Sequence, residues 1–338
     1  MMRTMGRTAQ LPAGTLALLA VVGSLLTAGC SLNRFAVNKL GNALAESGTT
    51  FASDDDPDLV AAATPFSLKL IESLLASAPN HRGLLLAAAS GFTQYSYAFV
   101  QQEAERLENE DVARAAAERA RARQLYLRAR DYGLRGLATR HTRFGERLRA
   151  DPLGAARAAT VTDVPLLYWT AASWGAAISL SKDNPETVAD QVLVEALIDR
   201  ALELDERFDD GAIHGFLISY ELVRQGAHGN PNERARAHFD RAVSLTSGQL
   251  ASPYVSLAEG VSLSRQDRRE FESLLRRALA VDPDARPEWR LANLIVQRRA
   301  RWLLSRADQL FLDPSPGSAS RPPMNIPLGG YPSYGRQP

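Results

Sequence analysis

Arg200-Ala-Leu-Glu-Leu-Asp205 returns in altered form as Arg241-Ala-Val-Ser-Leu-Thr246 and as Arg277-Ala-Leu-Ala-Val-Asp282. Successive copies begin 41 and 36 residues apart. The segments between the copies have apolar faces of their own, represented by Phe216, Leu217, Tyr220, Tyr254, Leu257, Ala258 and Val261. Each period therefore holds two helices, and the repetition predicts a series of helix hairpins.

These spacings lie near the ~34-residue period of tetratricopeptide helix pairs. No segment alternates polar and apolar residues as a half-buried strand does. A last apolar helix at about 286–311 is placed to cap the stack. The sequence predicts an all-α fold of tetratricopeptide-like stacked helix hairpins, which is an α-solenoid.

Helical patterning also fills the first half of the chain. Thr64 is a suitable N-cap and Pro65 a suitable first helical residue, and the helix they predict ends before Pro79. The segment from Leu84 to Val100 is apolar on nearly all sides through Ala89, which predicts a central, largely buried helix.

Two local patterns carry predictions of their own. A small-residue stripe is expected to let neighbouring helices approach closely, and it consists of Ala113, Ala116, Ala117 and Ala120. The paired carboxylates Asp209 and Asp210 occur where a helix is expected to begin, so N-capping and the helix dipole account for them.

The N-terminus has the order of a secretory signal peptide. Arg3 and Arg7 precede an eleven-residue apolar run, 16–26, which reaches only ~16 Å against the ~30 Å hydrocarbon core of a bilayer. Small residues then lead to Cys30, the only cysteine. Leu-Thr-Ala-Gly-Cys at 26–30 resembles a bacterial lipobox, so residues 1–29 are the predicted signal peptide and Cys30 the lipid attachment site.

The organisation that follows is a tether, a folded domain and a tail. Residues 30–61 are the expected tether, 62–313 the all-α domain and 314–338 a disordered proline-rich tail. The aspartates near position 55 do not form a calcium loop, because Leu59 and Pro65 replace the glycine and glutamate that such a loop needs. Ser31 stands where aspartate retains lipoproteins in the inner membrane of enterobacteria, so we expect a periplasmic domain anchored to the outer membrane rather than the inner one.

Composition and motifs argue against several functions. The net charge is +1, from 39 basic and 38 acidic residues, which disfavours binding to nucleic acid. The chain lacks the Gly-x-Ser-x-Gly, Gly-x-Gly-x-x-Gly, phosphate-loop and His-Glu-x-x-His motifs, and its five histidines are dispersed. We therefore expect no enzyme activity, no cofactor and no metal site.

The most unusual segment runs from Asp163 to Ile178 and places Tyr168, Trp169 and Trp174 among small residues. These aromatic side chains either fill the core where the N-terminal helices meet the repeats or line a cavity or channel for an apolar or amphipathic ligand. Lys182 follows Trp174 by eight residues and could meet a carboxylate there, or be an ordinary surface lysine.

Several segments together resemble the T-component (TatT) family of tripartite ATP-independent periplasmic (TRAP) transporters, which are tetratricopeptide-like lipoproteins. The matching segments are Leu84-Leu-Leu-Ala-Ala-Ala-Ser-Gly-Phe92, Leu125-Tyr-Leu-Arg-Ala-Arg-Asp-Tyr-Gly-Leu134, Leu167-Tyr-Trp-Thr-Ala-Ala-Ser-Trp-Gly175, Arg200-Ala-Leu-Glu-Leu-Asp205, Leu291-Ala-Asn-Leu294 and Arg299-Ala-Arg-Trp-Leu-Leu304. The resemblance extends from Thr64 to Asp313, and the tyrosine-tryptophan segment is its most specific part.

The resemblance implies a periplasmic accessory protein that binds the solute-binding subunit of a transporter, with self-association into a ring or pore. It also implies a hydrophobic or organic-acid ligand, and it places Tyr168, Trp169 and Trp174 on the family's aromatic segment as ligand-lining or pore-lining residues. Lys182 is added to this predicted set because of its position after Trp174. A bilayer, reached through the acylated Cys30, is the other expected partner. A tetratricopeptide-like scaffold for envelope assembly is the alternative function, because the same solenoid would serve it without a small ligand.

Overall fold

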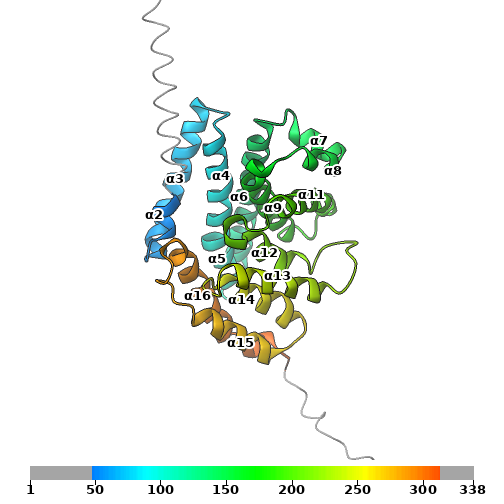
Figure 1. Ribbon diagram of the computed structural model, residues 1–338. Coiled ribbons are helices and arrows are strands. Elements are labelled where there is room, and N and C mark those ends of the chain that lie inside the picture. Colours follow the sequence, from blue (N-terminus) through cyan, green and yellow to red (C-terminus); the bar gives the residue numbers. More distant parts are fainter. Residues whose placement is uncertain (1–47, 313–338) are drawn as a thin grey trace, which may run out of the picture.

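All regular elements of residues 48–312, the part that the computed structural model describes, are helical (Figure 1). Residues 1–29, Cys30 and the proline-rich tail lie outside this part. The N-terminal elements are α2 (Gly48–Ala52), α3 (Pro57–Ser77), α4 (Arg82–Tyr95), η1 (Ser96–Gln101), α5 (Gln102–Leu107), α6 (Val112–Ala138), α7 (Phe144–Ala150), α8 (Pro152–Arg157), η2 (Val161–Asp163) and α9 (Val164–Ser179). In this bundle α4 and α9 both pack along the long helix α6.

The second half consists of packed helix pairs. Its elements are α10 (Pro185–Ala189), α11 (Gln191–Leu204), α12 (Phe208–Tyr220), α13 (Pro231–Leu245), α14 (Ser252–Leu257), η3 (Ala258–Ser262), α15 (Arg268–Leu279), η4 (Pro287–Trp289), α16 (Arg290–Ser305) and α17 (Ala307–Leu310). The three repeated stretches end α11, α13 and α15, and these helices pack against α9, α12 and α14. The predicted all-α fold of packed helix pairs is confirmed.

The first long helix begins earlier than its sequence pattern suggests. The Asp56 carboxylate accepts hydrogen bonds from the N–H groups of Asp58 and Leu59, both at 3.0 Å, so the helix starts at Pro57. Thr64 does not cap, because its hydroxyl donates to the Val60 carbonyl at 2.6 Å inside the helix. The predicted start at Pro65 is therefore wrong: an earlier Asp-Pro pair satisfies the same rules. Helix α2 and the start of α3 occupy residues that the sequence assigns to the tether.

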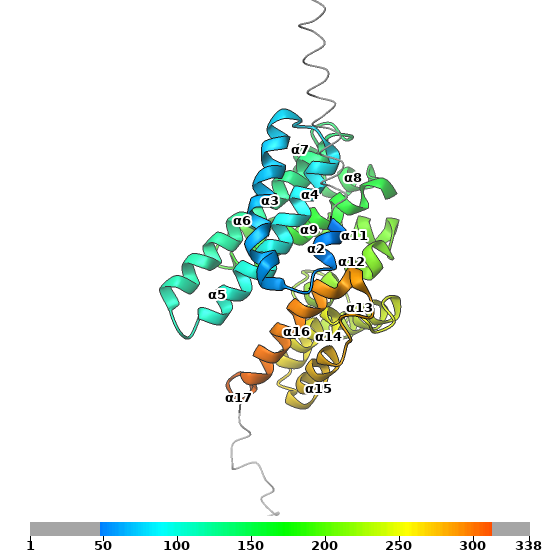
Figure 2. The same cartoon turned by 90° about the vertical axis from the view of Figure 1, so that its left-hand side faces the viewer.

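The close approach between helices lies at glycines rather than at the alanine stripe. A Cβ atom at Gly133 would collide with the Thr170 hydroxyl, and one at Gly136 would lie 2.5 Å from a methyl group of Leu166. Helices α6 and α9 can therefore pack this closely only if positions 133 and 136 are glycine. The prediction that the alanine stripe brings neighbouring helices close together is wrong, because all four alanines are exposed: Ala113, Ala116, Ala117 and Ala120. They lie where α5 and the first part of α6 project from the body (Figure 2).

Helix α16 joins the two ends of the described chain. It packs on α15 and α14, as expected of a cap, and it also packs on α2 and α3 (Figure 2). Arg290 donates to the Ser53 carbonyl at 3.1 Å, and Arg298 pairs with Asp58 at 2.7 Å. The stack of helices is thereby closed onto its own N-terminal bundle.

Candidate functional site

The aromatic segment identified in the sequence forms most of α9, which is held at its N-terminus by a buried carboxylate. Asp163 accepts hydrogen bonds from Arg82 at 2.6 Å, from the Thr160 N–H at 2.9 Å and from His141 at 3.0 Å. Burial alone would raise the pKa of Asp163, but hydrogen bonds from Thr160 and His141 and the charge of Arg82 bring it down to about 2. The carboxylate is therefore ionised, and it ties the start of α9 to Arg82 at the start of α4 and to His141 in the segment after α6.

Tyr168 and Trp169 form an aromatic pair at the N-terminal half of α9. Their ring centroids are 4.9 Å apart in an edge-to-face arrangement, and the ring of Phe208 lies 5.4 Å from that of Tyr168. Both side chains are half-buried. Burial, together with the charge of Asp209, raises the pKa of Tyr168 above its usual range, so the phenol keeps its proton and can donate a hydrogen bond.

Trp174 lies apart from this pair, in the hydrophobic core. It is 1% exposed, and the guanidinium groups of Arg130 and Arg149 lie 5.0 and 5.6 Å from its ring. Five residues turn through about 140° on an α-helix, so Trp169 and Trp174 face different directions. Of the two roles considered for these aromatic residues, filling the core is the one that matches the position of Trp174. Lys182 is exposed and lies just after the C-terminal end of α9. Among residues 48–312, it forms no hydrogen bond with Tyr168, Trp169 or Trp174.

The two tryptophans should respond differently to replacement by leucine. Trp174→Leu removes buried ring atoms and is expected to lower the unfolding free energy by about 2–4 kcal/mol. Trp169→Leu should lower it much less, because the ring is only half-buried. Urea denaturation followed by circular dichroism measures both. Equal losses in the two variants would contradict the separation of the rings.

The start of α12, beside this aromatic pair, has an unusual backbone. Asp209, Asp210 and Gly211 are all in the left-handed region, with φ of 47°, 52° and 92°. Neither aspartate forms a capping hydrogen bond, so the capping interpretation is wrong. Burial, with the neighbouring Asp210 charge, raises the pKa of Asp209. Left-handed non-glycine residues cost about 1–2 kcal/mol each, so the packing around Phe208 must hold this turn in place.

A second site joins the two halves of the molecule, at two short π-helices, η1 and η3. Arg299 of α16 donates from Nε to Glu259 of η3 at 2.9 Å and pairs with Glu105 of α5 at 2.7 Å. Its side chain is only 9% exposed. π-Helical turns occur frequently at functional sites because they displace side chains from the regular helical positions.

Tyr97 of η1 lies beside this ion cluster. Although 41% of the residue is exposed, protein surrounds its hydroxyl group, and this burial together with the charges of Glu259 and Glu105 raises the pKa of Tyr97 to about 12. The charges of Glu259 and Glu105 and the hydrogen bond to Glu259 raise the pKa of Arg299 despite its burial, so the guanidinium stays charged. The cluster can hold the two halves together and present a neutral phenol. Arg299 begins one of the segments that resemble the family, but no sequence pattern predicted its pairing with Glu105 and Glu259.

A family model described as TRAP transporter T-component matches residues 53–311, which is nearly the whole described part. The chain belongs to the TRAP transporter T-component family. A relative from Treponema pallidum (strain Nichols), described as an uncharacterized protein, is 31% identical over 317 residues, covering 87% of this chain and 97% of that protein. The resemblance seen in the sequence is confirmed.

Membership of the T-component family gives this protein a role associated with TRAP transporters. Proteins of this family are accessory components of transporters rather than enzymes. Membership also suggests an extracytoplasmic location and association with transporter components. The aromatic pair on α9 and the Arg299 cluster both lie within the matched residues.

This T-component brings together two histidines that are distant in sequence. His214 on α12 and His238 on α13 face each other with their Nδ1 atoms 2.8 Å apart, and Glu206 lies 3.5 Å from Nε2 of His214. Burial lowers the pKa of both imidazoles, which favours their neutral forms. A hydrogen bond between two neutral rings needs one Nδ1–H as the donor and the other Nδ1 as the acceptor. Within residues 48–312, no three ligand-type side chains gather in a way that would hold a metal ion.

Acidification should weaken the packing of α12 on α13. Because both folded-state pKa values lie below the usual 6.5, the unfolded chain binds more protons, and stability is lost as the pH falls below about 6.5. His238→Phe should remove part of this dependence. The check is urea denaturation of both proteins at about pH 7.5 and about pH 5. Identical pH slopes would contradict the lowered pKa of His238.

Proposed function

We propose that this protein is an accessory lipoprotein of a TRAP-type periplasmic solute transporter and binds its solute-binding subunit. The observation that carries the proposal is the family match across residues 53–311. Stacked helix pairs supply the extended surfaces by which such folds bind other proteins. Self-association into a ring is part of this proposal.

The ligand we propose is a hydrophobic molecule or an organic acid that contacts Tyr168 and Trp169. Support comes from the half-buried rings and from the protonated phenol, which can donate to a carboxylate. The sequence also suggested Trp174 and Lys182 as ligand-lining residues. Their role as ligand contacts has less support, because Trp174 is buried in the core and Lys182 is exposed beyond the end of α9.

The proposed anchor is a lipid on Cys30, which would hold the domain at the periplasmic face of the outer membrane in preference to the inner one. Cys30→Ser should abolish incorporation of a radiolabelled fatty acid while leaving the helical circular dichroism signal unchanged. Labelling that persists in this variant would contradict the anchor. Sucrose-gradient separation of the two membranes tests the location.

The experiment that tests the function is affinity capture of the full-length mature lipoprotein, tagged at its C-terminus, from detergent-solubilised envelopes. Mass spectrometry should identify a TRAP solute-binding protein, enriched over capture by an unrelated tagged lipoprotein. Capture of envelope-assembly factors without a solute-binding protein would contradict the transport role and favour the scaffold alternative.

A further inference from the structure

Four arginines form a ladder on α6. Arg114, Arg121, Arg128 and Arg135 follow one another at intervals of seven residues, and all four are exposed. Seven residues make almost two helical turns, so the four side chains stay on one stripe about 32 Å long. A chain whose net charge is only +1 thus carries an ordered row of guanidinium groups.

Three of these guanidinium groups lie over aromatic rings. Arg121 is 5.9 Å from the ring of Tyr95, Arg128 is 5.3 Å from that of Phe92, and Arg135 is 5.4 Å from that of Tyr132. Stacking on a ring restrains the planar guanidinium and leaves its N–H edges available for hydrogen bonds. The ladder is therefore partly organised before any partner arrives.

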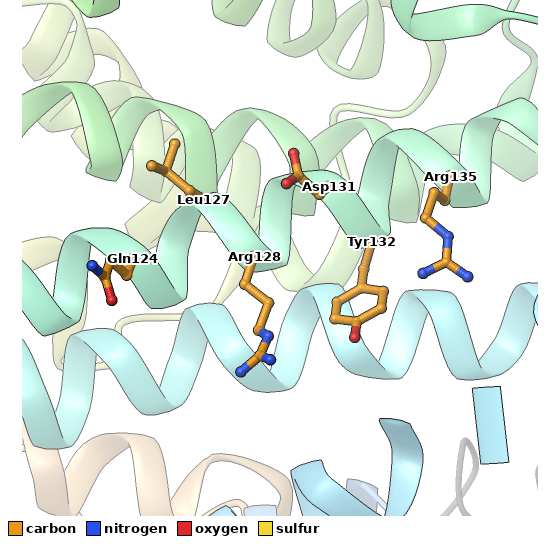
Figure 3. Close-up of a pocket in the computed structure, with 6 residues that line it drawn as sticks. All are labelled: Gln124, Leu127, Arg128, Asp131, Tyr132 and Arg135. Carbon is orange, nitrogen blue, oxygen red and sulfur yellow. The ribbon is translucent and has the colours of Figure 1, made fainter. Parts of the chain in front are cut away.

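The C-terminal half of the ladder borders a shallow groove of about 400 Å³ (Figure 3). In Figure 3, Arg128, Tyr132 and Arg135 extend from α6 toward the neighbouring helix, whereas Asp131 points to the other side. The groove is lined by Gln124, Leu127, Arg128, Asp131, Tyr132 and Arg135. Arginine and tyrosine are the residue types enriched at the energetic centres of protein interfaces.

The carboxylates near this groove are already bound. Glu72 of α3 accepts from Lys69 at 2.6 Å and from the Tyr132 hydroxyl at 2.7 Å, and it pairs with Arg128 at 3.0 Å. Asp131 pairs with the adjacent Arg130 at 2.7 Å.

Arg135 differs from the other arginines of the ladder. In the described part of the chain it forms no ion pair and donates only to the Pro79 carbonyl, at 3.0 Å. The groove therefore has more guanidinium charge than carboxylate charge.

We propose that the groove bordered by Arg128, Tyr132 and Arg135 binds a carboxylate-rich surface of the partner protein. This inference rests on the proposed function and names the face that meets the partner. Charge complementarity favours an acidic occupant, and the aromatic floor favours a protein surface with apolar groups beside its carboxylates. A bilayer fits less well, because electrostatic attachment to lipid takes a dense cluster of basic residues rather than arginines interleaved with paired carboxylates.

The test compares full-length mature lipoproteins in the capture experiment described above. Arg135→Glu alone, and Arg128→Glu with Arg135→Glu, should reduce the retained solute-binding protein roughly tenfold or more. Arg269→Glu is the matched control, because Arg269 is an exposed arginine on α15 that forms no ion pair within residues 48–312. It should retain the partner as the unmodified protein does.

Two further measurements separate the possible results. Raising the salt from about 50 mM to about 300 mM should weaken retention by the unmodified protein and leave little further loss in the Arg135→Glu variant. Arg128→Lys with Arg135→Lys preserves the charge and should retain more partner than the glutamate pair.

Equal retention by Arg135→Glu and by the unmodified protein, with matching thermal melts, would overturn the groove as the docking face. It would leave the transport role intact. Failure of the unmodified protein to capture any solute-binding protein would instead contradict the proposed function.

Discussion

Asp163→Ala is expected to lower the unfolding free energy by about 3–5 kcal/mol, because it leaves the Arg82 charge without its buried partner. The Asp163 side chain is 1% exposed and accepts hydrogen bonds from Arg82, His141 and Thr160. Loss of this one carboxylate removes the hydrogen bonds that join the start of α9 to Arg82 of α4 and to His141 after α6. Urea denaturation monitored by circular dichroism measures the loss.

Asp308→Asn is the control for Asp163, since Asp308 is 86% exposed in its ion pair with Arg268 and should contribute little. Acid titration offers a second check. Because the folded pKa of Asp163 is about 2, below its usual 3.8, its stabilising contribution is present above pH 3.8 and is lost as the pH falls toward 2. A stability loss in Asp163→Ala no larger than that in Asp308→Asn would contradict the buried role.

Arg299→Met should destabilise the protein by about 3 kcal/mol, because Glu105 and Glu259 would face each other without the intervening cation. The expected loss is at the lower end for a buried pair, since both carboxylates are 26% exposed. The same substitution should increase hydrogen exchange in α5 and α16 before other helices, because the cluster joins these two elements.

Arg268→Met is the matched control for Arg299. Arg268 also pairs with two carboxylates, Glu272 and Asp308, but it is 45% exposed and should contribute much less to stability, because solvent screens exposed ion pairs. Hydrogen exchange that rises uniformly in Arg299→Met, with no early release of α5 and α16, would argue against a local junction.

Part of the candidate site could be predicted from the sequence. The clustering of Tyr168, Trp169 and Trp174 singled out α9, which lies at the centre of the N-terminal bundle. The closeness of the two tryptophans in the sequence did not predict that Trp174 is buried in the core while Trp169 is only half-buried. Which face of an apolar helix is covered depends on its neighbours, and α9 is apolar nearly all round.

Other contacts of the site could not be predicted from local sequence patterns. Arg299 looks like one of many arginines on an amphipathic helix, and only the return of α16 to the N-terminal bundle brings it to Glu105. His214 and His238 are 24 residues apart and meet only because α12 packs on α13. A hydrogen bond between side chains on different helices requires both helices to be in place.

The sequence alone determined the all-α class, the repeated hairpins and the family, because helical periodicity and repeat spacing are properties of the chain. Tertiary structure decided the closure by α16, the ion cluster at Arg299 and the glycine contact of α6 with α9. It also decided that Asp56, rather than Thr64, caps α3. These features depend on burial and on distances between segments far apart in the chain, which local patterns do not encode.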